Sequence, residues 1–449
     1  MQNKVLAFSH KKENIFLTCF FLITLFFSTF FLDWSNNWNT VSRISLPLSL
    51  ALEQTLTIDT YQNFTGDKAQ KDQHYYSDKS PLVGILTTPI IKTLDYFVDL
   101  KNKSPQQRIS IALMVASFLF GALPFTFLVF FTIKDNNLYK KNGVLLVYFA
   151  FFGSFLFAFS GTYFSHSFCA LLLLLAFKNY SKNNFFVSGL LLGACFMTEY
   201  FYLFAGMVWG VNLLLQKKIK SAFLFALGVV PFLLLQGLYN YYQVGSPFEF
   251  AYKYTVNFQD VIQNYGFSIP SFTTLFHLTI SSYRGVFFYT PFLILILWNI
   301  WKKKKKLTAN QRLIWVTFVV LLLLFSANKN WYGGWSYGPR HLYAITAVVL
   351  YSNITLLEWN KSNQFIYILA GVWGIVGSFL NKFTLLYPST DINFPFINEL
   401  DAYIYKRLNQ GHLFPYYIEG YFPSILFVLL FVAGLLFLNR LQKSTFNPL

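Results

Sequence analysis

Charged residues are concentrated in one polar stretch, residues 33–82, of a chain that is otherwise mostly apolar. The stretch contains five aspartates and follows directly after the first apolar segment. Its ionisable side chains include Arg43, Asp59, Asp67, Lys68, Lys71, Asp72, His74, Asp78 and Lys79. Carboxylates and cations gathered beside a bilayer indicate a site that handles a charged substrate at the membrane edge. The alternative interpretation is an ordinary solvated loop.

The composition is that of a polytopic membrane protein. Hydrophobic residues make up 55% of the 449 positions, charged residues make up 12%, and the mean hydropathy is +0.45. The three cysteines, Cys19, Cys169 and Cys195, all lie in apolar segments, so a disulfide framework is not expected. The sequence contains no glycine-rich nucleotide loop and no metal-binding spacing. No cofactor is therefore required, while the use of a divalent metal stays open.

The net charge of +17 follows the membrane topology. If the basic turns between apolar segments face the cytoplasm, that side holds 20 of the 35 Lys and Arg residues and three acidic residues. The opposite side then sums to zero, so the whole excess of positive charge lies inside. This arrangement predicts a multi-pass membrane protein with both termini cytoplasmic. It requires no nucleic acid as a partner.

The apolar segments predict an all-α fold with about twelve membrane spans in a single domain, 1–449. The expected spans are 15–32, 110–133, 143–160, 164–177, 185–198, 201–215, 221–239, 285–301, 312–327, 342–357, 365–380 and 422–438. Residues 83–100 are expected to form an interfacial helix within the first outer loop. The expected outer segments are 33–109, 240–284, 328–341 and 381–421. Because the long segments share one face, we expect chemistry or recognition on that face.

Several motifs occur in the order found in a known family. They are Arg43 followed by Asp59, the segment YSDKSPL at 76–82, GLLLGACFMTEY at 189–200, YN at 239–240 with GSPFE at 245–249, YRG at 283–285, and WYGGWSYGPR at 331–340. Together they resemble the polytopic glycosyltransferases of the C-type superfamily, in particular glycosyltransferase family 39. That family includes the protein O-mannosyltransferases and the aminoarabinose transferases.

The resemblance implies an enzyme of the plasma membrane (the bacterial inner membrane) that transfers a sugar from a polyprenyl-phosphate carrier to an acceptor hydroxyl on the extracytoplasmic face, with inversion. The acceptor would be a lipid, a glycan or a protein. The acceptor hydroxyl needs one carboxylate as general base. The departing phosphate needs only fixed cations, because it is already a stable anion.

The family places the base in the first outer loop, commonly in an Asp-Glu pair just before an Arg. Here Thr40, Val41 and Ser42 precede Arg43, so the acid must come from elsewhere. Asp59 is the first candidate because it stands at a switch from apolar to polar residues, although it could simply cap a helix. Asp78 is the second catalytic candidate. Asp33 and Asp67 remain alternatives.

Cations in the matched motifs are the expected phosphate ligands, namely Lys79, Arg340, Arg43 and Arg284. For Lys79 and Arg284, snorkelling beside a helix is the alternative. The expected sugar or acceptor pocket contains Tyr76, His166, Glu199 and Trp335, of which Glu199 is costly in apolar sequence unless it is paired. His166 could equally be a structural group.

Two other classes of membrane protein would also handle lipid-linked sugars. A transporter or flippase would need charges at both leaflets, whereas the cytoplasmic turns here are short. A polymerase or ligase of surface glycans would concentrate arginines in a late outer loop, whereas here Arg and Asp concentrate in the first one.

Overall fold

The protein is a helical bundle with one small hairpin. The computed structural model describes residues 2–33, 37–141, 143–258, 263–302, 304, 306–384, 388–405 and 420–446. The strands in this part of the chain are β1 (Lys68–Lys71) and β2 (His74–Ser77), which pair antiparallel. The helices are α1 (Gln2–Thr29), α2 (Trp38–Leu48), α3 (Leu82–Val98), α4 (Pro105–Ser117), α5 (Leu123–Asp135), α6 (Val144–Phe152), α7 (Phe155–Ala158), α8 (His166–Ser181), α9 (Phe185–Thr198), α10 (Leu203–Leu215), α11 (Ile219–Val244), α13 (Phe272–Thr279), α14 (Val286–Tyr289), α15 (Pro291–Lys302), α16 (Ala309–Ser326), α17 (Tyr343–Asn353), α18 (Gln364–Phe383), α19 (Pro395–Ile404) and α20 (Phe422–Phe446).

Within the described residues, six helical segments are long and apolar enough to cross a membrane, which fits an all-α membrane protein. They are Lys11–Thr29, Pro105–Asp135, Ile219–Val244, Ala309–Ser326, Gln364–Phe383 and Phe422–Phe446, and the shorter apolar helices are Phe185–Thr198, Tyr200–Leu215 and Pro291–Lys302. The expected count of twelve spans is therefore not supported.

Part of the shortfall arises because the helices over 164–177, 185–198 and 201–215 are shorter than a span, and the rest arises where backbone breaks divide apolar runs that the sequence shows as continuous. The run 143–160 is split into α6 and α7 at Gly153 and Ser154, and the run 285–301 is split into α14 and α15 before Pro291. Proline lacks the amide hydrogen that a continuing helix requires. The run 342–357 likewise contains only the eleven residues of α17 as α-helix.

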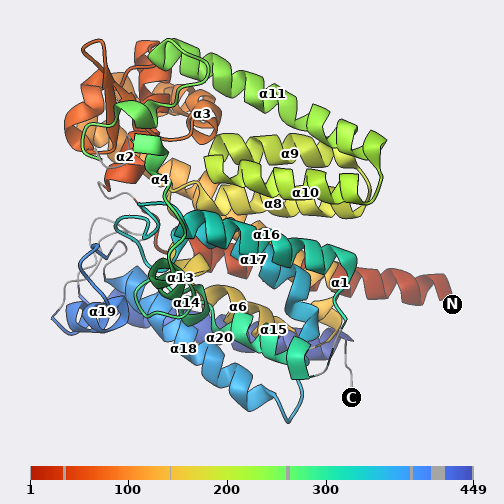
Figure 1. Cartoon of the computed structure of the whole chain (residues 1–449). Coiled ribbons are helices and arrows are strands. Elements are labelled where there is room, and N and C mark those ends of the chain that lie inside the picture. The colour runs from red at the N-terminus through yellow and green to blue at the C-terminus, as the bar shows by residue number, and fades with distance from the viewer. Residues whose placement is uncertain are drawn as a thin grey trace.

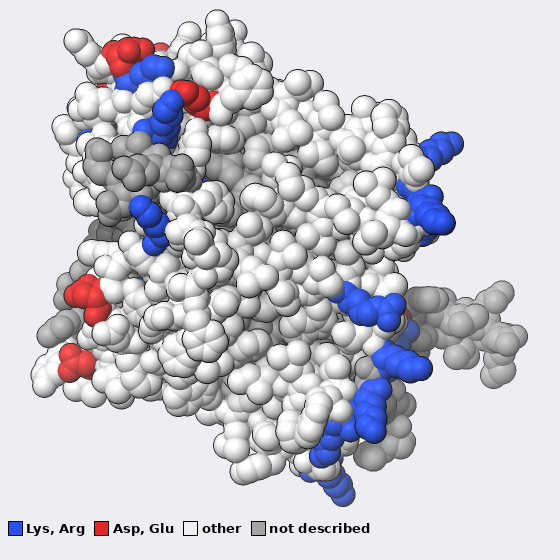
Figure 2. Space-filling view, viewed as in Figure 1, with Lys and Arg blue, Asp and Glu red and all other residues white. Residues whose placement is uncertain are grey.

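The long helices lie roughly parallel, so the bundle has two ends (Figure 1). One end, which we call the hairpin end, holds the β1–β2 hairpin, α2, α3 and α19. The other end holds the turns between α10 and α11 and between α15 and α16. Figure 2 shows Lys and Arg side chains gathered at this second end, which we call the basic end, whereas at the hairpin end Lys and Arg side chains are mixed with Asp and Glu.

In part of the bundle, neighbouring helices pack closely at glycine residues, where no side chain separates the two backbones. Helices α9 and α11 make one of these contacts, where a Cβ added to Gly189 would lie 1.9 Å from the carbonyl oxygen of Phe225. Small residues allow such an approach, and packing of this kind is a main source of helix association in membranes. The rest of the core is rich in phenylalanine, including Phe27, Phe152 and Phe427.

The first polar stretch folds into a compact cap at the hairpin end. Its helices α2 and α3 pack against each other and, together with α4, enclose a second apolar core that includes Val41, Ile44 and Val83. The helix expected over 83–100 is confirmed as α3. The cap holds the hairpin rigidly against the bundle, and the hairpin in turn positions the charged side chains described next.

Candidate functional site

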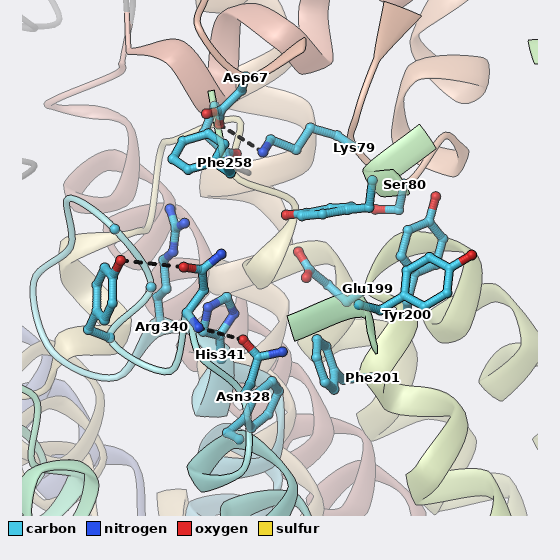
Figure 3. Close-up of a pocket in the computed structure, with 18 of the residues that line it drawn as sticks. Asp67, Lys79, Ser80, Glu199, Tyr200, Phe201, Phe258, Asn328, Arg340 and His341 are labelled. Atoms are coloured by element: carbon cyan, nitrogen blue, oxygen red, sulfur yellow. Dashed lines mark hydrogen bonds and ion pairs between the residues drawn. The ribbon is translucent and has the colours of Figure 1, made fainter. Parts of the chain in front are cut away.

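A cavity of about 930 Å³ lies at the hairpin end, between the cap and the ends of the long helices. Its charged lining residues are Arg43, Asp67, Lys79, Glu199 and Arg340, and its walls include the aromatic rings of Phe201, Phe204, Phe250, Phe267 and Phe325. In Figure 3, Lys79 reaches toward Asp67 at one side, while Glu199 and Arg340 lie on opposite sides of the open space. The cavity thus combines charged groups with an apolar aromatic wall, as ligand sites commonly do.

The hairpin brings Asp67 and Lys79 together. Its two-residue turn consists of Asp72 and Gln73, both at positive φ. Lys68 pairs with Ser77, and continuing this register by one residue places Asp67 beside Asp78. Lys79 Nζ lies 2.8 Å from Asp67 Oδ2 and 3.1 Å from Asp78 Oδ1. An ammonium has three N–H donors, so the third remains for a ligand. Burial opposes the charge of Lys79, but the two carboxylates outweigh burial and raise the pKa of Lys79.

Asp78 is buried behind Lys79 and does not line the cavity. Its Oδ1 accepts a hydrogen bond of 3.4 Å from Ser42 Oγ, and its Oδ2 is buried without a partner. Burial raises the pKa of Asp78, against the opposing effect of the Lys79 charge. Asp78 therefore holds Lys79 in place and is not positioned to reach an acceptor, contrary to the expectation that it is catalytic.

Glu199 is held by three donors through a single oxygen. Ser165 Oγ donates to Oε1 at 2.6 Å, His166 Nδ1 lies 3.2 Å from Oε1, and Arg43 Nη2 donates to it at 3.4 Å. Burial alone would raise the pKa of Glu199, but His166, Arg43 and Ser165 together lower it well below its usual range. The pairing expected for a carboxylate in apolar sequence is found, although its partner is Arg43 and not Arg340.

Arg340 has no carboxylate partner within salt-bridge distance among the described residues, and its Nε is buried without a hydrogen bond. Its guanidinium lies 5.0 Å from the centre of the Phe164 ring. The loop can pass this close because residue 333 is glycine: a Cβ there would lie 3.0 Å from Nε, and φ is +73°. A desolvated cation facing a cavity without an anion of its own is suited to bind an anionic ligand.

Arg284 was expected to contact phosphate, and its position contradicts this. The side chain is fully buried and donates to the carbonyl oxygens of Tyr283 at 2.9 Å, Tyr332 at 3.0 Å and Gly334 at 3.3 Å. Its donors are used to shape the loop that carries Arg340. Arg284 therefore stabilises the cavity wall, because each of its three guanidinium nitrogens already donates to a carbonyl oxygen and few N–H donors remain for a ligand.

Asp59, the first candidate for the base, lies away from the cavity. Its Oδ2 is 2.7 Å from His74 Nδ1, its Oδ1 accepts from the Tyr75 amide at 2.7 Å, and its side chain is 40% exposed. Asp59 is the first residue of a 3-10 helix (Asp59–Phe64). Its place at the change from apolar to polar residues is therefore explained by a local structural role. Tyr76 lies in β2 opposite Ala69 and is also absent from the cavity lining, so the expected pocket role of Tyr76 is not supported.

The remaining candidates divide between the cavity and the core. Arg43, Lys79, His166, Glu199, Trp335 and Arg340 line the cavity, as expected from the sequence. Of the alternative acids, Asp67 lines the cavity and Asp33 is buried outside it. Among the described residues there is no group of three His, Cys, Asp or Glu side chains that could hold a metal ion.

Several cavity residues were missed by the sequence reasoning. They are Asn37, Trp38, Asn39, Asn328 and Asn330. A hairpin interpretation of residues 67–78 would have indicated the importance of Asp67, since a two-residue turn at 72–73 places position 67 opposite position 78. No sequence signal separates these asparagines from asparagines in ordinary turns.

Comparison of the chain with protein-family models, with curated proteins and with solved structures finds no match. The family resemblance of the motifs therefore remains an expectation. The function must be argued from the cavity.

Proposed function

We propose that this chain is a membrane glycosyltransferase that moves a sugar from a polyprenyl-phosphate carrier to an acceptor hydroxyl, with inversion at the anomeric carbon. The observation that carries the proposal is the cavity at the hairpin end, in which Arg340 has no anionic partner among the described residues and Lys79 keeps one donor beside the carboxylate of Asp67. A phosphate would bring the missing negative charge to these cations.

The charge distribution supports an extracytoplasmic site. Lys and Arg side chains gather at the basic end of the bundle in Figure 2, and the positive-inside rule assigns such an end to the cytoplasm. The hairpin end and its cavity then face outward. At that face a donor cannot be a soluble cytoplasmic nucleotide sugar, so a lipid-linked donor fits.

The aromatic wall supports a lipid carrier. Phe201 and Phe204 come from the start of α10 and the turn before it, and Phe325 comes from the end of α16. Phe248 also lines the cavity and is 88% exposed, so the apolar lining continues to the surface of the protein. A polyprenyl chain could lie along this apolar path with its phosphate at Lys79 and Arg340.

Asp67 is the best-placed base. In the proposed step the acceptor oxygen forms a bond to the anomeric carbon, the bond from that carbon to the phosphate oxygen breaks, and polyprenyl phosphate leaves with the electron pair. The acceptor proton passes to Asp67, whose Oδ1 has no recorded hydrogen-bond partner in the described part of the chain. Glu199 also faces the cavity, but its three donors stabilise the anion and make it a weak base.

The test is mass spectrometry of surface glycans and lipids from cells lacking the gene and from cells complemented with variants. The wild-type protein and Asp59→Asn should restore one sugar modification, and Asp67→Asn, inserted in the membrane at equal level, should not. The donor should accumulate on the outer leaflet in the deletion strain. Accumulation on the inner leaflet would instead indicate a flippase, and an unchanged glycan and lipid profile would refute the proposal.

A further inference from the structure

Two tryptophans lie at the mouth of the cavity, Trp335 from the expected acceptor pocket and Trp38, which the sequence did not single out. Trp38 begins α2 and is 53% exposed, and Trp335 lies in the loop before Arg340 and is 58% exposed. One side of the Trp38 ring is packed, because a Cβ added to Gly66 would lie 2.5 Å from its ring carbons. The two residues come from loops nearly 300 positions apart and line the same cavity. They offer aromatic faces to a ligand that enters from outside.

Asparagines at the same cavity are oriented as donors. Asn37 Oδ1 accepts from the Asn39 amide at 2.9 Å, and Asn39 Oδ1 accepts from Arg43 Nε at 3.0 Å. Asn328 Oδ1 accepts from the Asn330 amide at 2.7 Å. Because each partner is an N–H group, each interaction determines which end of the side-chain amide is oxygen. The three Nδ2 groups have no recorded partner in the described part of the chain, and each is left to donate to a ligand.

The combination of aromatic faces and amide donors matches the chemistry of a sugar. A pyranose ring presents C–H bonds on its faces, which are attracted to the negative face of an aromatic ring, and oxygens around its edge, which accept from amide groups. Trp38, Trp335 and the asparagines carry no charge, and the cations deeper in the cavity are assigned to the donor phosphate. An anionic acceptor would find no further unpaired cation among the described lining residues.

We propose that the acceptor is a neutral glycan whose terminal sugars stack on Trp38 and Trp335 and accept hydrogen bonds from the asparagine side chains. As an acceptor site it rests on the glycosyltransferase function proposed above. As a binding site it does not, because a glycan can bind these groups when no donor is present. The proposal thus ranks a neutral glycan above a peptide or an anionic lipid headgroup as the acceptor.

The experiment measures glycan binding without any donor. The full-length protein in lipid nanodiscs is titrated with neutral tetrasaccharides of glucose, galactose, mannose and N-acetylglucosamine, and binding is followed by saturation-transfer NMR of the ligand. We expect at least one tetrasaccharide to bind. Trp38→Ala and Trp335→Ala should each weaken that binding by about fivefold, since one stacked aromatic contact of this kind is worth roughly 1 kcal/mol.

Two further variants separate stacking from general damage. Trp335→Phe keeps an aromatic face and should retain most of the affinity. Trp301→Ala removes a tryptophan that is 71% exposed at the basic end, next to Lys302, and should bind like the wild type. A serine-containing peptide and an anionic glycolipid headgroup are titrated in parallel.

The proposal is overturned if none of the four tetrasaccharides binds the wild type, if the peptide or the anionic headgroup binds more tightly, or if Trp301→Ala weakens binding as much as the variants at the mouth. Glycan binding in a protein that shows no transfer would leave this inference standing and remove the proposed function. Transfer of a sugar to a peptide would support the proposed glycosyltransferase function and overturn the inference that the acceptor is a neutral glycan.

Discussion

Two arginines near the cavity should respond to the same substitution with opposite changes in stability. Arg340 has a buried Nε without a hydrogen bond, whereas the Arg284 side chain donates to three carbonyl oxygens. Methionine keeps an unbranched, flexible side chain and removes the charged guanidinium in both cases. The pair therefore tests whether Arg340 is kept for a ligand and Arg284 for the fold.

The expected magnitudes follow from these contacts. Removing the unpartnered polar group of Arg340 recovers about 1–3 kcal/mol, and the lost contact with the Phe164 ring subtracts about 0.5–1 kcal/mol. Arg340→Met should thus raise the free energy of unfolding by roughly 1 kcal/mol. Arg284→Met leaves three carbonyl oxygens without donors at about 1 kcal/mol or more each, so it should lower the free energy of unfolding by about 3 kcal/mol.

The assay is thermal unfolding in a single detergent, with and without polyprenyl phosphate. The lipid should raise the midpoint of the wild type, because a ligand that binds only the folded state stabilises it. Arg340→Met should melt higher than the wild type and respond less to the lipid, with affinity reduced by about tenfold or more for the loss of one charge-assisted contact. Arg284→Met should melt lower.

The reasoning would be refuted if both variants were destabilised to a similar extent, because Arg340 would then be as well satisfied as Arg284. An unchanged response of Arg340→Met to polyprenyl phosphate would separately remove Arg340 from the phosphate site. Either result can be read without knowing the sugar or the acceptor.

Three further predictions concern the base, the charge of Glu199 and the helix packing. In a reconstituted transfer assay, Asp67→Asn should lower turnover by about 10²–10⁴-fold, the usual contribution of a general base, whereas Asp59→Asn should keep wild-type turnover. The pKa of Glu199 is lower in the folded protein than its ordinary value of 4.5, so its contribution to stability is present above about pH 4.5 and is lost as the pH falls below it. Melting curves from pH 6 to pH 3 should therefore fall less steeply for Glu199→Gln, and parallel curves would contradict this. Gly189→Ala should destabilise the protein by about 1–3 kcal/mol through overpacking against α11, whereas Gly210→Ala, where the nearest atom lies 4.0 Å from the added Cβ, should melt like the wild type.

The positions of the helices could be predicted from the sequence to a large extent. Segments 185–198 and 201–215 were expected as two helices with Glu199 between them, and the structure has α9 and α10 there. A helix over 83–100 was also expected from its apolar and charged pattern, and the structure has α3 there. These features depend on local composition, which a helix in an apolar environment must satisfy along its own length.

The number of spans could not be predicted in the same way. Hydropathy records how apolar a run is, but it does not show that the run bends, as the chain does between α6 and α7 and between α14 and α15. A break inside the bundle is tolerated when neighbouring groups satisfy the backbone, and those neighbours are known only from the tertiary structure.

The residues of the candidate site could likewise be predicted only in part from the sequence. The sequence alone determined that the first polar stretch and the loop ending in Arg340 would carry the charged chemistry, since few other stretches on that face combine acids with cations. Only the tertiary structure decided which residues share the cavity: the hairpin turns Asp67 toward Lys79 and leaves Asp59 with His74 at the surface. Two aspartates eight residues apart have the same chemistry, and their roles differ because folding buries one beside a cation at the cavity and leaves the other in contact with solvent.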